Sequence, residues 1–245
     1  MKKIFLSIAL LCAASLVAPT AATAQNLVPI PLKMASAQGQ PLVWQNVGQI
    51  NCPDELANEK AHLLRILADR AGVTTLNDNG TAQITLSIDT SLSDDEAYTL
   101  VVSEKGVIIQ GRTARGVFYG LMTFDQLLRG NGTSACCESI PQLRIADQPR
   151  THIRELMLDP CRTFIPFDEL KAFVPEMARY KYNTIHLHLT DDQAWRIEIK
   201  KYPELTAQAS ARVGMDDMLI PISGYYTQEQ MKDFVKYCAQ YHVMV

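Results

Sequence analysis

The order of elements after residue 148 restricts the fold more than any other feature of the sequence. Residues 153–159 and 183–190 predict strands, residues 167–180 and 227–241 predict helices, and residues 243–245 predict the start of a third strand. A strand–helix–strand–helix order is typical of parallel β/α construction. These elements are too few to close an eight-stranded barrel, which takes about 250 residues. We therefore expect the first two to three β/α units of an incomplete TIM (β/α)8 barrel.

The preceding part of the chain, residues 25–147, has a different pattern. Leucines at helical spacing predict a helix at residues 54–71, and an apolar stripe of Val117, Leu121, Phe124 and Leu128 predicts a second at residues 113–128. Alternating or apolar runs between turns predict three strands, at residues 83–89, 98–103 and 107–110. This mixture predicts a small α+β N-terminal domain with helices covering one face of a sheet. The whole chain is thus expected to be α/β, with residues 148–245 forming the partial barrel.

The first residues have the composition of a secretory signal peptide. Lys2 and Lys3 precede a mostly apolar run over residues 4–17, and Ala22-Thr23-Ala24 provides small residues before a cut at Gln25. The apolar run is short for a ~20-residue membrane span. We expect residues 1–24 to be removed and the protein to be exported, to the periplasm or outside the cell. No later segment is apolar for long enough to predict a membrane span.

Charge and cysteine content exclude several other classes of protein. The formal net charge of −3 provides no basic surface for a nucleic-acid partner. Outside the signal peptide the cysteines are odd in number and irregular in spacing, which favours neither a zinc ribbon nor a dense disulfide framework. We expect mostly free thiols, with at most one bridge, among Cys52, Cys136, Cys137, Cys161 and Cys238.

Polar side chains are concentrated at the ends of the two predicted barrel strands. In the second strand, His186 and His188 share one face, and the opposite face is apolar. Asp191 and Asp192 follow this strand directly, at the end where barrel active sites lie. The first strand ends similarly, so we expect one polar rim that contains Asp159, Arg162, His188, Asp191 and Asp192.

Each of these residues also has a structural interpretation. The structural alternative is a hydrogen-bonded pair for the histidines, a loop start or helix cap for the two aspartates, and a surface ion pair for Arg162. Glu155 is expected to pair with Arg154 rather than to act in a site. Residues 195–200 predict an additional extended arm, on which Trp195 either stacks on a sugar or packs beneath a loop.

Several segments resemble the family 20 glycoside hydrolases, the β-N-acetylhexosaminidases. Within the predicted barrel, five segments fit the family pattern in the correct order and spacing, at residues 154–164, 177–183, 186–192, 195–205 and 224–230. Residues 96–100 and 116–128 resemble the small α/β domain that precedes the barrel in bacterial members. Together these segments extend the resemblance from Glu96 to the end of the sequence.

The resemblance implies an activity and a role for each rim residue. It implies removal of terminal non-reducing N-acetylglucosamine or N-acetylgalactosamine from glycans, by a retaining mechanism in which the substrate's own acetamido oxygen attacks the anomeric carbon. Arg162 matches the arginine that binds hydroxyls of the terminal sugar, and Asp191 matches an aspartate that supports the catalytic acid through a later histidine. His188 and Asp192 would shape the rim around it, and Trp195 is the candidate for stacking on the sugar. The resemblance implies a carbohydrate partner and neither a metal nor an organic cofactor.

The family's catalytic Asp–Glu pair is not found in this sequence. Three pairs of neighbouring acidic residues include a glutamate: Asp54-Glu55, Asp95-Glu96 and Asp168-Glu169. Their positions predict helix starts or loops, and none of the three pairs follows a barrel strand. We therefore expect the acid/base glutamate to lie beyond Val245, or the reading frame to be truncated. The 245-residue chain alone is expected to be inactive.

Two other functions are compatible with the residues. One is a metal-dependent barrel hydrolase whose ligands are His186, His188 and either Asp191 or Asp192, because H-x-H on a barrel strand suits zinc. The other is a non-catalytic carbohydrate-binding module. The sequence also departs from the family pattern, with Glu155 in place of glycine and Cys161 in place of a common serine.

Overall fold

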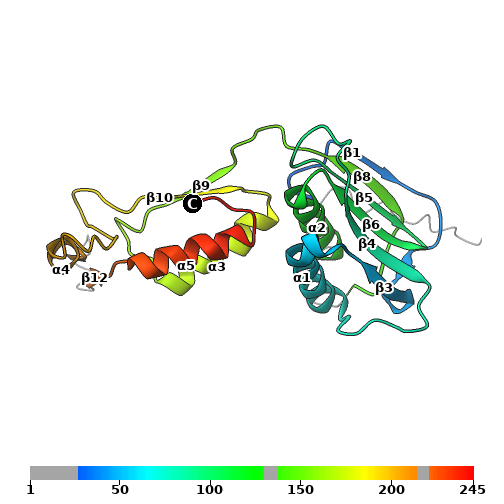
Figure 1. Ribbon diagram of the computed structural model, residues 1–245, viewed down its shortest axis with the longest axis horizontal. Helices are drawn as coiled ribbons and strands as arrows, with labels where there is room; N and C mark the ends of the chain where they lie inside the picture. Colours follow the sequence, from blue (N-terminus) through cyan, green and yellow to red (C-terminus); the bar gives the residue numbers. More distant parts are fainter. Residues whose placement is uncertain (1–26, 130–136, 214–220) are drawn as a thin grey trace, which may run out of the picture.

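The computed structural model describes residues 27–129, 137–213 and 221–245. The predicted signal peptide and Cys136 lie outside these residues. Two lobes are visible, one built on a broad sheet with helices α1 and α2, the other on a narrow sheet with helices α3 and α5 (Figure 1). This arrangement confirms the predicted fold class, a small α+β domain followed by the beginning of a β/α barrel.

The first lobe is built on a six-stranded mixed sheet. Its strand order is β1-β8-β5-β6-β4-β3, with bounds β1 Lys33–Ser36, β3 Val47–Asn51, β4 Ala82–Ile88, β5 Tyr98–Ser103, β6 Gly106–Gly111 and β8 Leu143–Asp147. β5 and β6 form the predicted hairpin, and β6, β4 and β3 run parallel to one another. A short pair, β2 (Leu42–Val43) with β7 (Ser139–Ile140), is separate from the sheet.

Two helices cover one face of this sheet (Figure 1). α1 (Ala57–Ile66) continues as a π-helical segment to Ala71, and Gly72 ends it in the left-handed conformation with φ of 67°. α2 (Ala114–Arg129) is almost wholly buried and lies close to the sheet, since a Cβ at Gly120 would be 2.5 Å from the side chain of Ile109. The stripe of apolar residues that predicted this helix, Val117, Leu121, Phe124 and Leu128, lies in the core.

The second lobe begins with two parallel strands and their crossover helix. β9 (Glu155–Leu158) pairs with β10 (Thr184–Leu187), and α3 (Phe167–Arg179) connects them. α5 (Gln228–Ala239) lies on the same side as α3 (Figure 1), and its N-terminus has a complete capping box between Thr227 and Gln230. A parallel bridge joins Met244 to Thr184, where the third strand was predicted.

The segment between β10 and α5 is mostly irregular. It contains α4 (Glu204–Ala209) and a short hairpin of β11 (Ala211–Val213) with β12 (Pro221–Ser223). The arm predicted at residues 195–200 forms two isolated bridges, Thr190 with Trp195 and Ile197 with Tyr226, rather than a regular strand.

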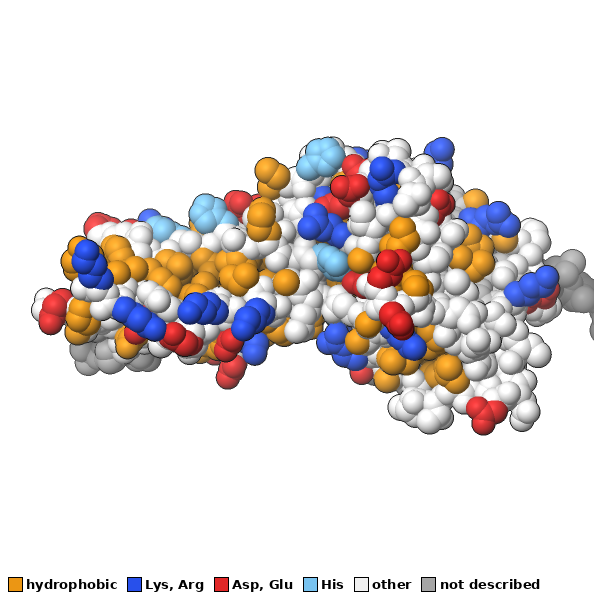
Figure 2. Space-filling view, viewed as in Figure 1, with side chains coloured by type: hydrophobic (Ala, Val, Ile, Leu, Met, Phe, Trp, Pro, Cys, Tyr) orange, Lys and Arg blue, Asp and Glu red, His pale blue; other side chains and the backbone are white. Residues whose placement is uncertain are grey.

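A band of apolar side chains covers the second lobe in the space-filling view, with Lys and Arg side chains along its lower border (Figure 2). Large apolar residues of this lobe with at least 40% of their surface exposed include Ile153, Met157, Phe173, Val235 and Met244. None of the described helices combines the length and the hydropathy that crossing a bilayer requires.

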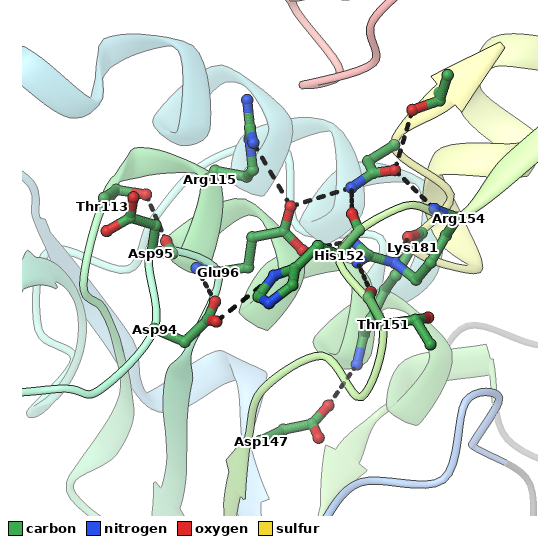
Figure 3. A network of polar contacts seen from close by, with 12 residues as sticks. Asp94, Asp95, Glu96, Thr113, Arg115, Asp147, Thr151, His152, Arg154 and Lys181 are labelled. Atoms are coloured by element: carbon green, nitrogen blue, oxygen red, sulfur yellow. Dashed lines mark hydrogen bonds and ion pairs between the residues drawn. The ribbon is translucent and has the colours of Figure 1, made fainter.

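The two lobes are joined by buried charged groups (Figure 3). Arg154, directly before β9, donates to Glu96 of the first lobe, and the Nζ of Lys181 donates to Asp147 at 2.9 Å. The expectation that Arg154 pairs with Glu155 is therefore wrong. Arg154 turns toward the first lobe, whereas Glu155 lies on the opposite side of the strand and contacts His186 at 3.2 Å.

Candidate functional site

The carboxyl ends of β9 and β10 form one polar rim, as the sequence predicted. The backbone amide of His188 donates to the carbonyl of Leu158 at 2.9 Å, and the amide of Cys161 donates to the carbonyl of His188 at 3.0 Å. These bonds continue the pairing beyond the regular strands. They fix the loop after β9 against the loop after β10, so side chains from both loops meet.

Arg162 is held by acceptors on both sides of the rim. Its Nη1 donates to Oδ2 of Asp159 at 2.6 Å, and its Nε donates to Oε1 of Gln193 at 3.1 Å. The same Nε lies 3.6 Å from Oδ2 of Asp191. Burial opposes ionisation of Asp159, but the hydrogen bonds from Arg162 outweigh it and lower the pKa of that carboxyl. The Arg162 guanidinium is therefore half-exposed and held in one orientation, which suits it to binding two adjacent hydroxyls.

Asp191 is the most enclosed carboxylate of the rim. Its Oδ1 accepts from the Cys161 thiol at 2.8 Å and from the amide of Gln193 at 2.8 Å. Its Oδ2 is buried and accepts no hydrogen bond within the described part of the chain. The thiol and amide donors lower the pKa of Asp191, so the group is a carboxylate at neutral pH. Burial and the adjacent carboxylate raise the pKa of Cys161.

The two histidines have different surroundings. His188 is within the rim, with Nδ1 3.2 Å from Oδ1 of Asp159 and Nε2 3.6 Å from Oδ2 of Asp191. His186 is more exposed and contacts Glu155 outside the rim. Within the described ranges, the group with metal-ligand spacing consists of Cys161, His188 and Asp191. The ligand set predicted for a metal hydrolase shares His188 and Asp191 with this group, whereas His186 and the alternative ligand Asp192 lie outside it.

Asp192 and Trp195 are at the periphery of the rim. Asp192 is exposed and accepts from the Gln193 side chain at 3.1 Å. Trp195 is partly buried, and its indole Nε1 donates to the carbonyl of Ile197 at 2.6 Å. This bond fixes the indole ring on its own loop and leaves part of its surface accessible.

A buried arginine supports the rim from beneath. The side chain of Arg196 is fully buried, and its Nε donates to the carbonyls of Pro160 at 3.0 Å and Cys161 at 3.3 Å. Its Nη1 donates to the carbonyls of Ser210 and Gly224. Arg196 was not among the residues predicted from the sequence to belong to the site. Its position within a family-like segment was the only available signal.

Comparison with known families agrees with this geometry. Residues 24–148 match the model described as glycosyl hydrolase family 20, domain 2. Residues 152–245 match the model described as glycosyl hydrolase family 20, catalytic domain. The chain belongs to glycosyl hydrolase family 20.

Similar members of this family come from several bacteria. The chain is 35% identical over 229 residues to a beta-hexosaminidase of Porphyromonas gingivalis and 39% identical over 185 residues to one of Akkermansia muciniphila, matches that cover 90% and 76% of this chain. It spans 29% and 34% of those relatives' lengths. The solved N-acetyl-beta-hexosaminidase of Streptomyces plicatus, in complex with Thio-NAglucal, has a TM-score of 0.78 at 32% identity, covering 94% of this chain and 46% of that one.

Proposed function

We propose that this chain supplies the N-terminal domain and part of the sugar-binding rim of a β-N-acetylhexosaminidase. The reaction would be hydrolysis of terminal non-reducing N-acetylglucosamine or N-acetylgalactosamine from glycans or oligosaccharides. The observation that carries this proposal is the position of Arg162. Its guanidinium reaches from the end of β9 to within 3.6 Å of Asp191 after β10, and half of the side chain is exposed.

In this proposal Arg162 binds the terminal sugar. Its planar fork presents parallel N–H donors to two neighbouring hydroxyls, which a lysine ammonium would not match. Asp159 keeps the guanidinium in this orientation through hydrogen bonds to its Nη1 and its backbone amide. Binding of the non-reacting part of the sugar positions the scissile bond relative to groups elsewhere in the barrel.

Asp191 would act as a positioning residue. It is ionised and partly buried, and one of its two oxygens is already bound by protein donors. The second oxygen is available to orient another side chain of the barrel. The remaining rim residues, His188, Asp192 and Trp195, would shape the entrance around the sugar.

We also propose that the protein is exported. The signal-like pattern of residues 1–24 supports this, and oligosaccharides from cell walls or host glycans would then be accessible substrates. N-terminal sequencing of the protein recovered outside the cytoplasm tests the proposal. An N-terminus at Gln25 is expected, and recovery of uncleaved protein from the cytoplasm would contradict it.

A segment exchange tests the proposed activity. Residues 152–245 replace the matching segment of the Akkermansia muciniphila beta-hexosaminidase, and turnover of an aryl N-acetyl-glucosaminide is measured. The exchanged enzyme is expected to be active, because the segment retains the residues that bind and orient the sugar. A folded but inactive exchange, beside an active parent enzyme, would contradict the proposal.

A further inference from the structure

A cavity lies where the two lobes meet, near the amino ends of β9 and β10. Its volume is about 260 Å³, and its walls come from both lobes and from the segment that joins them. Tyr98 and Tyr119 belong to the first lobe, Arg154 and Lys181 to the second. Roughly 150 Å³ is enough for a benzene ring, so the cavity can hold a ring with a substituent.

Much of the cavity wall is apolar. Pro29, Ile30 and Pro149 contribute aliphatic surface, and Tyr98 and Tyr119 contribute aromatic rings. An apolar lining with a few polar groups is typical of small-molecule sites, which occur preferentially between domains. A bound sugar would leave most of its hydroxyls without partners in such a cavity. The wall therefore favours a compact apolar ligand.

Lys181 reaches the cavity because of the way α3 ends. Its amide donates to the carbonyl of Ala178 at 2.8 Å, and the amide of Tyr182 donates to the carbonyl of Met177 at 3.1 Å. These two bonds form a Schellman motif, in which the residue at the position of Lys181 is left-handed and usually glycine. Lys181 has a φ of 63°. Lysine thus occupies a position that glycine fits better, and its side chain supplies an ammonium group to the cavity wall.

Two buried donors at the cavity have unused capacity. The ammonium of Lys181, whose side chain is 8% exposed, has three N–H donors. It donates to the hydroxyl of Tyr98 at 2.8 Å and to Oδ2 of Asp147 at 2.9 Å (Figure 3), and no third acceptor is found among the described residues. The hydroxyl of Tyr119 is buried without a hydrogen-bond partner in the described part of the chain. A ligand with acceptor oxygens would satisfy both donors.

The charges at the cavity favour an anion. Three basic residues line it, Arg150, Arg154 and Lys181, together with two acidic residues, Glu96 and Asp147. Arg154 pairs with Glu96, and Lys181 pairs with Asp147. Arg150 makes no ion pair with any residue that the structure describes. A carboxylate therefore suits the cavity, since it combines acceptor oxygens with one negative charge.

We propose that this cavity binds a small carboxylic acid with a compact apolar body, of the size of a benzoate. The carboxylate would bind Lys181 and Tyr119, and the body would lie against Ile30 and the prolines. Because the walls come from both lobes, the bound acid would bridge them. The site is independent of the proposed glycosidase activity, because the cavity shares no residue with the sugar-binding rim.

Equilibrium dialysis of the complete chain against radiolabelled benzoate tests the site. One saturable benzoate per chain is expected. Acetate retains the carboxylate without the ring, and benzamide retains the ring without the charge. Each should compete at least about tenfold more weakly than benzoate, through loss of apolar burial or of a hydrogen bond between charged groups. Absence of saturable binding, or acetate or benzamide competing as strongly as benzoate, would overturn the proposal.

A matched pair of variants locates the bound acid. Ile30→Asp places a negative charge at an exposed residue of the cavity and should weaken benzoate binding about tenfold. Ile153→Asp introduces the same charge outside the cavity, at a residue that is 72% exposed against 71% for Ile30. This control should bind benzoate like the unmodified chain. Equal loss in the two variants, or no loss in Ile30→Asp, would overturn the proposal.

Two further variants test the basic residues. Lys181→Met removes the ammonium and should weaken benzoate binding at least about tenfold. Asp147 then lacks its partner, so circular dichroism checks that this variant is folded. Arg150→Gln changes an exposed residue and should weaken binding about threefold, whereas Arg144→Gln, on the exposed face of β8, should not. Unchanged affinity in folded Lys181→Met, or in Arg150→Gln if Lys181→Met does not fold, would overturn the proposal.

Discussion

Glu96 and Arg154 join the two lobes through a hydrogen-bonded ion pair. Oε2 of Glu96 accepts from Nη2 of Arg154 at 2.5 Å, and Oε1 accepts from Nδ2 of Asn183 at 3.1 Å. Arg154 directly precedes β9 and Asn183 directly precedes β10. One carboxylate of the N-terminal domain therefore fixes the start of both barrel strands (Figure 3). The rim lies at the opposite ends of the same strands, so this contact sets its orientation.

Replacing Glu96 by glutamine should destabilise the chain strongly. The carboxylate is buried, and its loss leaves the mostly buried Arg154 guanidinium without its counter-charge. Removing one member of a buried ion pair costs on the order of 3–5 kcal/mol. Urea unfolding measures the change. Glu104→Gln, in the exposed β5–β6 turn, is the matched control, and a comparable loss in both variants would contradict the assigned role.

Acidification should weaken the contact between α1 and the end of α5. Burial, partly offset by the hydrogen bond from Nε2 to the carbonyl of Gln240, lowers the pKa of His62 to about 4. Arg65 and His242 also disfavour the charged ring, whereas Glu59 favours it. The unfolded chain binds a proton near pH 6.5, so the stability that neutral His62 contributes is present above pH 6.5 and is lost as the pH falls toward 4.

The size of this effect is on the order of 3 kcal/mol across that window. His62→Gln retains a donor for the Gln240 carbonyl and does not titrate. Its free energy of unfolding, measured between pH 7 and pH 4, should fall less steeply than that of the unmodified chain. Identical pH profiles for the two proteins would contradict the assignment.

Arg196→Lys should destabilise the barrel lobe. A single ammonium cannot replace the guanidinium at the carbonyls of Pro160, Cys161, Ser210 and Gly224 together. Each buried acceptor left without a donor costs about 1–3 kcal/mol. Thermal unfolding should show a lower midpoint for this variant, whereas Arg150→Lys, at an exposed position, should leave it unchanged. Equal midpoints for Arg196→Lys and the unmodified chain would contradict the inference.

The sequence predicted those parts of the fold that depend on local periodicity. Alternation in residues 183–190 indicated which face of β10 is apolar, and Ile185 is buried while His186 is exposed. Asp191 and Arg162 were predicted to meet because parallel strands end at the same edge. The apolar stripe on one face of α2 could be recognised in the sequence because the helix is several turns long.

Other features depend on contacts that local sequence does not encode. The strands β1, β3 and β8 were not predicted: β1 is mostly exposed, and β3 and β8 pair with strands that are distant in the sequence. Glu96 and Arg154 are 58 residues apart, so their pairing follows from lobe packing. Cys161 meets Asp191 because the loops after β9 and β10 pack together, which is why the thiol was expected to be unremarkable and was not included with His188 and Asp191 in the predicted ligand set.

The most direct test of the sugar-binding assignment is the effect of Arg162 on catalysis in the exchanged hexosaminidase described above. Arg162→Lys retains the positive charge but not the fork, so KM for an aryl N-acetyl-glucosaminide should rise at least about tenfold, the equivalent of one charge-assisted hydrogen bond. Lys201→Arg, at an exposed position on the same segment, should leave kcat and KM unchanged. Loss of sugar affinity confined to the Arg162 variant is the result that our account predicts, and an Arg162→Lys enzyme with unchanged KM and kcat would contradict it.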